Sequence, residues 1–244
     1  MFETLEIMGY SVFIDDLEKV SIENKDKFII NTINPHSYVV AKKDKLFQKA
    51  LKESDILVPD GSGFVIAANF IHNKKKINKI AGFDVHQDLL NKLNKTRGKV
   101  FYMGSSPNTL SKIRERLSKE FPNIKAEFYS PPFKPMFDEE DNKKIIEEIN
   151  KFNPDVLFVG MTAPKQEKWL YENKDKVNFK VASCIGAVFD FYAGTVKRPS
   201  EFWIKMHLEW LPRFFKEPKR LWRRNFVSTP IFLKDMIVYK YFVL

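Results

Sequence analysis

The chain has 244 residues, of which 44% are hydrophobic and 30% are charged, and its formal net charge is +10. This composition is typical of a globular protein and excludes a disordered or fibrous one, and the length suits one α/β domain with an appendage. No run approaches the roughly 20 apolar residues of a spanning helix, and no basic-then-apolar leader opens the chain, so we expect neither a membrane-integral nor a secreted protein.

Short apolar runs alternate with helical patterns from about residue 26 to residue 194. The runs are rich in β-branched and aromatic residues and predict six strands: Lys27 to Ile33, Ile56 to Val58, Lys99 to Met103, Ala126 to Tyr129, Val156 to Val159 and Lys180 to Ile185. Apolar residues at spacings of three and four predict helices between them, near residues 43–52, 62–72, 84–95, 107–120, 138–152 and 164–175. This alternation predicts an α/β fold with a Rossmann-like, mostly parallel sheet and helices on both faces, which we place in residues 1–195.

The chain changes character after Gly194, where an aromatic and basic tract begins. From Lys197 to the C-terminus there are eleven Lys and Arg residues against four Asp and Glu residues. Basic residues recur at spacings of three and four, at Arg213, Lys216, Arg220 and Arg223. Apolar residues recur at spacings of four and seven, at Trp210, Phe214 and Leu221. We therefore expect residues 196–244 to form a basic amphipathic helical appendage that meets an anionic partner, such as phosphate, a lipid surface or nucleic acid.

The single cysteine, Cys184, lies in an apolar run, which indicates a core residue and a reducing compartment. The four histidines show no spacing typical of metal ligands, and His36 is the one nearest to a predicted strand end.

Polar residues and glycines follow directly after several of the predicted strands. In an open parallel sheet, ligands bind beyond the carboxyl ends of the strands. Glycine lets a ligand approach the backbone, and the start of a helix offers free N–H groups to phosphate. We therefore look for the functional site at this edge of the sheet.

Six motifs in chain order carry a resemblance to a known family. They are Thr32-Ile33-Asn34, Pro59-Asp60-Gly61, Ala81-Gly82-Phe83-Asp84, Ala163-Pro164-Lys165-Gln166-Glu167, the run from Gly186 to Gly194, and Glu209-Trp210-Leu211-Pro212-Arg213 with Glu217-Pro218-Lys219-Arg220. Together they resemble the WecG/TagA/CpsF glycosyltransferase family over roughly residues 5 to 228. The resemblance implies an inverting transfer of a sugar from a UDP donor to an undecaprenyl-diphosphate-linked saccharide, without a metal. Two segments depart from the family pattern, at residues 130–137 and at Pro212.

Asp60 is the candidate general base. An inverting transfer needs one carboxylate to take the proton of the acceptor hydroxyl while its oxygen attacks the anomeric carbon. The resemblance places the family's proposed catalytic aspartate at this position. The alternative is that Pro59-Asp60-Gly61 is a turn in which Asp60 caps the next helix.

The remaining candidates are assigned to substrate binding. Thr32 and Asn34 follow a strand and could bind the donor sugar or the acceptor, although Asn34-Pro35 could equally be a simple loop start. Gln166 and Asp84 are implied as substrate contacts by the resemblance. Asp190 could bind the uracil or the ribose, or else cap a helix. Glycines at two strand ends, Gly104 and Gly186, would let the nucleotide lie against the sheet.

Arginines are expected to stabilise the leaving diphosphate. Breaking the bond between the sugar and the diphosphate develops negative charge on UDP, which a metal or fixed cations must balance. The sequence has no Asp-x-Asp triplet, and we expect neither a metal nor a cofactor. Arg213, Arg220 and Arg223 match the family's essential C-terminal arginines and could serve either the donor diphosphate or that of the acceptor, since guanidinium groups suit bidentate phosphate binding. The alternative is a solvated basic helix face.

Two other functions fit the sequence less well. The basic charge suggests a nucleic-acid-binding protein, but the basic tract is paired with an apolar stripe, so we expect no nucleic acid partner. A dinucleotide-dependent oxidoreductase would need a Gly-x-Gly-x-x-Gly fingerprint after the first strand, which is absent. We expect a cytoplasmic protein, peripheral on the inner face of the cell membrane, whose partners are the UDP-sugar, the lipid-linked acceptor and the membrane surface. A homo-oligomer is left open.

Overall fold

The computed structural model describes residues 2–72, 77, 79–196, 203, 214 and 218–243. A six-stranded parallel sheet forms its centre, in the spatial order β4-β3-β8-β7-β5-β6. The strands are β3 (Phe28–Ile33), β4 (Ile56–Pro59), β5 (Lys99–Gly104), β6 (Lys125–Tyr129), β7 (Val156–Gly160) and β8 (Val181–Cys184). All six predicted strands are therefore confirmed, with ends shifted by no more than one or two residues.

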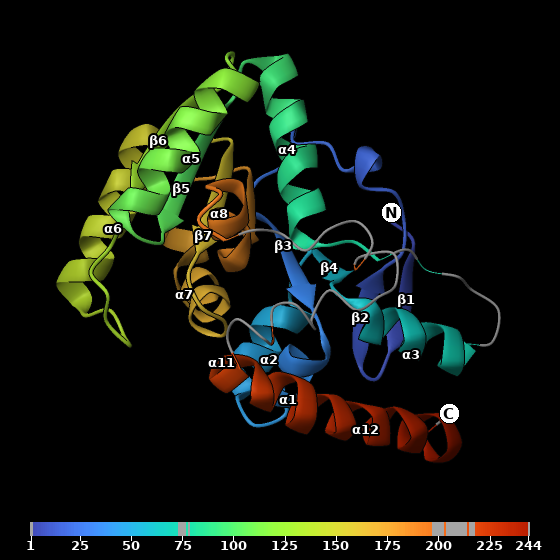
Figure 1. Cartoon of the computed structure of the whole chain (residues 1–244). Coiled ribbons are helices and arrows are strands. Elements are labelled where there is room, and N and C mark those ends of the chain that lie inside the picture. The colour runs from blue at the N-terminus through green and yellow to red at the C-terminus, as the bar shows by residue number, and fades with distance from the viewer. Residues whose placement is uncertain are drawn as a thin grey trace.

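Helices cover both faces of the sheet, as the alternation of strand and helix patterns predicted (Figure 1). One face packs against α4 (Gly82–Thr96), α5 (Pro107–Glu120) and α8 (Gly186–Tyr192), and the other against α6 (Glu139–Phe152) and α7 (Lys165–Asn173). Successive residues of β5 alternate between the two cores, with Tyr102 in the first and Phe101 and Met103 in the second. This period of two follows from the pleat of a strand, so each strand contributes to both cores.

A third apolar cluster lies beside β4 and contains elements that the sequence did not predict. The hairpin β1 (Thr4–Ile7) and β2 (Tyr10–Phe13) turns at Met8 and Gly9, both with positive φ. The helix α1 (Pro35–Ala41) follows β3 directly. With α2 (Lys45–Lys52) and α3 (Ser62–His72), these elements form a core that lies at one end of the sheet.

The C-terminal residues complete this third cluster. The helix α11 (Pro218–Trp222) runs into a π-helical turn, η3 (Arg223–Ser228), and then into α12 (Thr229–Phe242). Phe232 and Met236 of α12 are buried in the cluster, and Phe232 lies edge-on to Tyr38 of α1 with ring centroids 5.4 Å apart. Figure 1 shows α11 and α12 as one continuous rod beside α1, at the end of the sheet toward which the strand arrows point.

The outward face of α12 is apolar. The basic face expected of the appendage rests on Arg213, Lys216, Arg220 and Arg223, of which the structure describes only the side chain of Arg223. Within the described residues, the exposed side chains of α12 include one lysine, Lys234, and a row of large apolar groups: Ile231, Leu233, Ile237, Val238, Tyr241 and Phe242. None of the described helices is both long enough and apolar enough to span a membrane.

Candidate functional site

The carboxyl ends of the six strands meet at one edge of the sheet, and most of the predicted site residues lie there. Ile33 of β3 pairs with Pro59 of β4, and the Asp60 N–H donates to the Ile33 carbonyl at 2.9 Å. Asp60 and Asn34, each the first residue after its strand, are therefore neighbours. Gly186 follows β8, which pairs with both β3 and β7, so it lies on the next strand of the same edge.

Asp60 lies in the turn between β4 and α3 and is half-buried. Gly61, with a φ of +88°, makes the sharp change of direction, which glycine tolerates without steric cost. Gly63 in the first turn of α3 packs so closely on α1 that an added Cβ would lie 2.2 Å from Pro35 Cγ. The turn expected from Pro59-Asp60-Gly61 is thus present, and the catalytic role of Asp60 stays a prediction.

Asn34 has a structural task in addition to its predicted one. Its side-chain oxygen accepts hydrogen bonds from the N–H groups of His36 and Ser37, both at 3.0 Å, and so caps α1. This oxygen is thereby committed to the helix, and the amide nitrogen remains to meet a ligand. Thr32 lies two residues earlier in β3 and is half-buried beside the same edge. The substrate roles of Thr32 and Asn34 stay predictions.

Gln166 joins the ends of two strands. Its side-chain oxygen accepts from the N–H of Met161 after β7 and from the N–H of Gly186 after β8, each at 3.1 Å. Its amide nitrogen donates to Glu167 at 2.8 Å. Gln166 is buried and both ends of its amide have protein partners, so the geometry supports a role in shaping the site, and direct substrate contact stays a prediction.

Glycines at the strand ends are required by the protein itself. A Cβ on Gly186 would lie 1.9 Å from the Met161 carbonyl oxygen, and a Cβ on Gly104 would lie 2.4 Å from that of Gly160. Because these distances are far below van der Waals contact, no side chain fits at either position. The approach of a nucleotide to the backbone at Gly104 and Gly186 stays a prediction.

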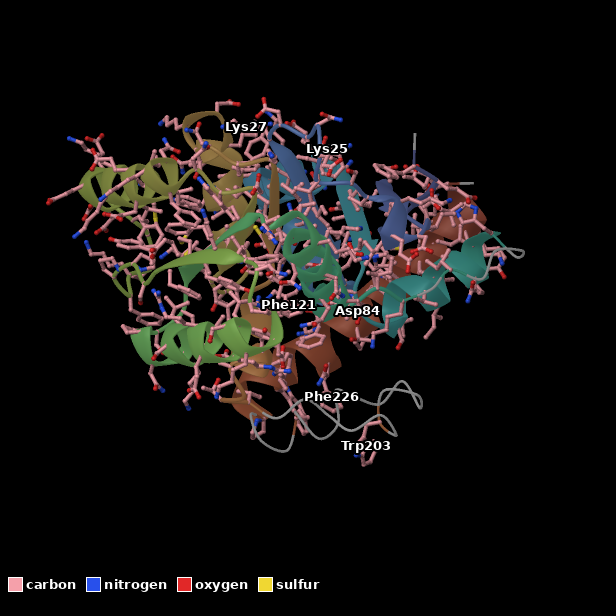
Figure 2. The ribbon with its side chains drawn as sticks, turned by 90° about the horizontal axis from the view of Figure 1, so that it is seen from above. Lys25, Lys27, Asp84, Phe121, Trp203 and Phe226 are labelled. Atoms are coloured by element: carbon pink, nitrogen blue, oxygen red, sulfur yellow. The ribbon has the colours of Figure 1, made fainter. Side chains whose placement is uncertain are left out.

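Asp84 and Asp190 lie on helices that begin at the same edge. Asp84 is the third residue of α4, and its carboxylate accepts from the Ala81 N–H at 2.8 Å. Asp190 lies inside α8, where its carboxylate accepts from the Thr195 hydroxyl at 3.3 Å. The residue that caps the start of α8 is Ile185, so the alternative of Asp190 as the N-cap is wrong. In Figure 2, Asp84 and Phe226 lie on one side of the molecule, and Lys25 and Lys27 on the opposite side.

The predicted arginines are described only in part. Arg213 lies outside the described residues, and of Arg220 only the backbone, in α11, is described. Arg223 is exposed in η3, next to Arg224. Burial, followed by the charges of Arg224 and Arg223, lowers the pKa of His36 in the first turn of α1. The cationic turn therefore lies within electrostatic reach of the carboxyl end of β3, close to Asn34.

Three further residues of this region were not predicted. His36 Nδ1 and Ser228 Oγ are 2.8 Å apart and connect α1 to η3. Glu167 is only 4% exposed, burial raises its pKa to about 7, and one of its carboxylate oxygens has no hydrogen-bond partner within the described part of the chain. The sequence gives no signal for Glu167 beyond its place next to Gln166, whereas Asn34-Pro35 is a recognisable helix start that would have placed His36 in a helix.

Two other titratable groups are structural. Cys184 is buried in the second core, as predicted. His86 is fully buried beside Tyr102, whose hydroxyl lies 2.8 Å from His86 Nε2, and burial lowers the pKa of His86 to about 3. Among the described residues, no group of three or more His, Cys, Asp or Glu side chains could hold a metal ion. The absence of a metal from the reaction stays a prediction.

The sequence matches known proteins along nearly its whole length. The model of the glycosyl transferase WecG/TagA/CpsF family matches residues 6–243. The chain is similar to the N-acetylglucosaminyldiphosphoundecaprenol N-acetyl-beta-D-mannosaminyltransferase of Bacillus subtilis (strain 168), with 33% identity over 212 residues, 87% of this chain and 80% of that protein. The enzyme of the same name from Bacillus spizizenii is 30% identical over 92% of this chain and 84% of its own length. That from Staphylococcus aureus (strain MW2) is 26% identical over 86% and 80%.

Proposed function

The chain belongs to the WecG/TagA/CpsF family of glycosyl transferases, and from that premise we propose that it transfers a sugar from a UDP donor to a polyprenyl-diphosphate-linked saccharide, with inversion and without a metal. The observation that carries the proposal is the placement of Asp60 and Asn34 on adjacent strand ends, with the cationic turn Arg223-Arg224 nearby. The product would enter cell-surface polysaccharide or teichoic acid synthesis.

Asp60 acts as the general base in this proposal. The acceptor hydroxyl oxygen forms a bond to the anomeric carbon of the donor sugar while the bond from that carbon to the diphosphate oxygen breaks. The hydroxyl proton passes to the Asp60 carboxylate, and UDP leaves with the electron pair of the broken bond. A positioned base of this kind contributes roughly 10²- to 10⁴-fold to a rate.

Arginines balance the charge that develops on the leaving diphosphate. Arg223 and Arg224 act on His36 at the start of α1, which places fixed positive charge near the β3 end of the edge. Arg213 and Arg220 are assigned the same task by the family motif. Fixed cations aimed at developing charge are among the strongest contributors to catalysis, because they need no rearrangement during the reaction.

The donor nucleotide is proposed to lie over the ends of β8, β7 and β5. The backbone there is flat at Gly186 and Gly104, and Gln166 holds the first two ends together. Asp190 and Asp84 are proposed to contact the nucleotide and the sugar. The donor sugar would be N-acetylmannosamine, its uronate, glucose or glucuronate, and the names of the relatives favour N-acetylmannosamine, with N-acetylglucosaminyl-diphosphoundecaprenol as the acceptor.

The apolar face of α12 is proposed to bind the membrane that holds the acceptor. A row of exposed large apolar side chains marks an interaction surface, and the exposed Lys234 on the same helix suits anionic lipid headgroups. The enzyme would then be cytoplasmic and peripheral, with its strand-end edge facing the lipid.

A screen of UDP-sugars by thermal shift, followed by transfer assays with an N-acetylglucosaminyl-diphospho-lipid acceptor, tests the proposal. We expect at least one UDP-sugar to raise the melting temperature, because a ligand that binds only the folded state stabilises it, and the same donor to support transfer in the presence of EDTA. Absence of transfer with every UDP-sugar would refute the donor assignment. Loss of transfer on chelation, restored by a divalent metal, would refute metal independence.

A further inference from the structure

The first turn of α1 is joined to the C-terminal turn η3 by one hydrogen bond between residues far apart in the sequence. His36 Nδ1 and Ser228 Oγ lie 2.8 Å apart, and Ser228 is only 2% exposed. His36 comes two residues after Asn34, whose backbone and side chain define the start of α1. The contact therefore connects the catalytic edge of the sheet directly to the segment that carries the arginines.

Ser228 is the last residue of the π-helical turn that holds these arginines. In a π turn the backbone is wider than in an α-helix, and such turns are often found at functional sites because they change the direction of side chains. The Thr229 hydroxyl donates to the Arg224 carbonyl at 3.3 Å, five residues back, and so closes the turn. Fixing Ser228 thus fixes the end of the turn from which Arg223 and Arg224 project.

The surroundings of His36 favour a neutral ring that can make this contact. Burial and the two arginines lower its pKa, so the imidazole is uncharged at neutral pH and can stand beside the two cations without repulsion. A lysine or arginine at position 36 would add a third positive charge in the same place. A neutral histidine at position 36 can therefore hold the arginines close without adding a charge that would compete with them for an anionic ligand.

The other ties of the C-terminal helix to the core lie further along α12. Lys42, which follows α1, pairs with Asp235 at 2.5 Å, and Phe232 packs against Tyr38 and Phe64. These contacts hold α12 on α1 and α3, but they begin four or more residues after Ser228. The hydrogen bond between His36 and Ser228 differs from them because it holds η3 itself.

We infer that His36 is a positioning residue, which through its hydrogen bond to Ser228 holds η3 so that Arg223 and Arg224 face the diphosphate bound at the ends of β3 and β4. The kinetic part of this inference rests on the proposed function, whereas the contact itself does not. The role requires the hydrogen bond and not an ionisable ring, so an asparagine at position 36, whose amide reaches the place of Nδ1, should replace it.

The test compares His36→Ala, Ser228→Ala and His36→Asn in the full-length chain, with Lys144→Ala on the exposed face of α6 as the control. Transfer is measured with a UDP-sugar and a lipid-linked acceptor, and amide hydrogen exchange is measured over residues 218–230. We expect both alanine variants to lose roughly tenfold to a hundredfold in kcat/KM, the order that a misplacement of about 1 Å produces, and to exchange faster in η3. His36→Asn should stay within about threefold of the wild type in both measurements, as should the control.

Each outcome decides the inference. Wild-type exchange in both alanine variants would overturn the contact, and wild-type kcat/KM in both would overturn its role in catalysis. Equal impairment of His36→Asn and His36→Ala would show that the ring itself, rather than its position-holding bond, is needed. If the wild type transfers no sugar from any UDP donor, the proposed function fails, and the exchange data still decide whether His36 and Ser228 hold η3.

Discussion

The carboxyl edge of the sheet differs in construction between the ends of β7 and β8 and the ends of β3 and β4. At the ends of β7 and β8, Gln166 ties two backbone N–H groups together and the neighbouring glycines leave no space for side chains. At the ends of β3 and β4, a carboxylate and a capping amide come from short turns, and the nearby cations come from a turn about 190 residues further along the chain. On the first side, the closely packed backbone suits the binding of a nucleotide. The second brings together groups that could take up a proton and balance charge.

The largest expected effect comes from removing the carboxylate on the β3–β4 side. Asp60→Asn keeps the size and shape of the side chain but cannot accept the acceptor proton, so we expect kcat to fall by roughly 10²- to 10⁴-fold. The affinity for UDP, measured by calorimetry, should stay within a few fold, because the nucleotide is proposed to bind on the other side of the edge. Asp175→Asn, at an exposed position, is the control. A loss of UDP binding in proportion to the loss of rate would assign Asp60 to donor binding and erase the division between the two sides.

On the β7–β8 side, the sharpest change is Gly186→Ala. The added Cβ would lie 1.9 Å from the Met161 carbonyl oxygen, so the two strand-end loops must separate. We expect a loss of about 2–4 kcal/mol in unfolding free energy, or a fall of roughly 5–15 °C in melting temperature, together with weaker UDP binding. Ala187→Ser is the control, because it changes the neighbouring residue at an exposed position. A Gly186→Ala protein that melts and binds UDP like the wild type would show that the close packing of this backbone is not needed for either property.

Glu167→Gln probes the same side through pH. Because burial raises the pKa of Glu167 to about 7, above its value near 4.5 in an unfolded chain, its contribution to stability is present at low pH and is lost as the pH rises from about 4.5 to about 7. Glutamine stays neutral at every pH. The free energy of unfolding of the variant should therefore rise by about 3 kcal/mol relative to that of the wild type across this pH range, and the difference should stay constant at higher pH. The measurement is urea unfolding at several pH values. Glu172→Gln, exposed on the same helix, corrects for the change of one charge, and an equal slope in the two variants would contradict the prediction.

The smallest effect is expected at the apolar outward surface of the C-terminal helix, which is proposed to bind the membrane. Ile237 is 47% exposed on the outward face of α12, so Ile237→Asp should leave the fold and the transfer to a water-soluble acceptor analogue unchanged. Sedimentation with vesicles containing anionic lipid should weaken roughly five- to tenfold, from the loss of part of one apolar side chain and the added negative charge. Lys176→Asp, in the short turn after α7, is the control, because it changes the net charge more than Ile237→Asp does but on another surface. If it weakens sedimentation as much as Ile237→Asp does, net charge rather than the α12 face controls lipid binding.

The parallel sheet was predictable because its strands are short β-branched and aromatic runs separated by long amphipathic helices, a pattern that few other folds produce. The hairpin of β1 and β2 was not, because its strands have four residues each and its turn, Met8-Gly9, lacks the asparagine or aspartate that usually marks such turns. The helix α1 was missed although Asn34 and Pro35 are typical first residues of a helix. At this point the interpretation of Asn-Pro as a loop start outweighed a signal that was present.

The sequence predicted where the site residues lie better than it predicted what each side chain does there. Strand-end residues were placed at the right edge because parallel strands bring their carboxyl ends together. The hydrogen bonds that occupy Gln166 and Asn34 depend on N–H groups presented by the folded backbone, and no residue type announces them. The contact between His36 and Ser228 joins positions 192 residues apart, which sequence spacing cannot reveal.

The π turn also fixes the rotation between the two halves of the C-terminal rod. An α-helix advances by about 100° per residue and a π turn by less, so winding the same six residues, Arg223 to Ser228, as a regular α-helix would swing the preceding side chains by about 100° relative to α12. The cations and the apolar outward face of α12 would then point in unrelated directions, even though every side chain was kept. The relative directions of these two groups of side chains therefore depend on keeping the π turn itself.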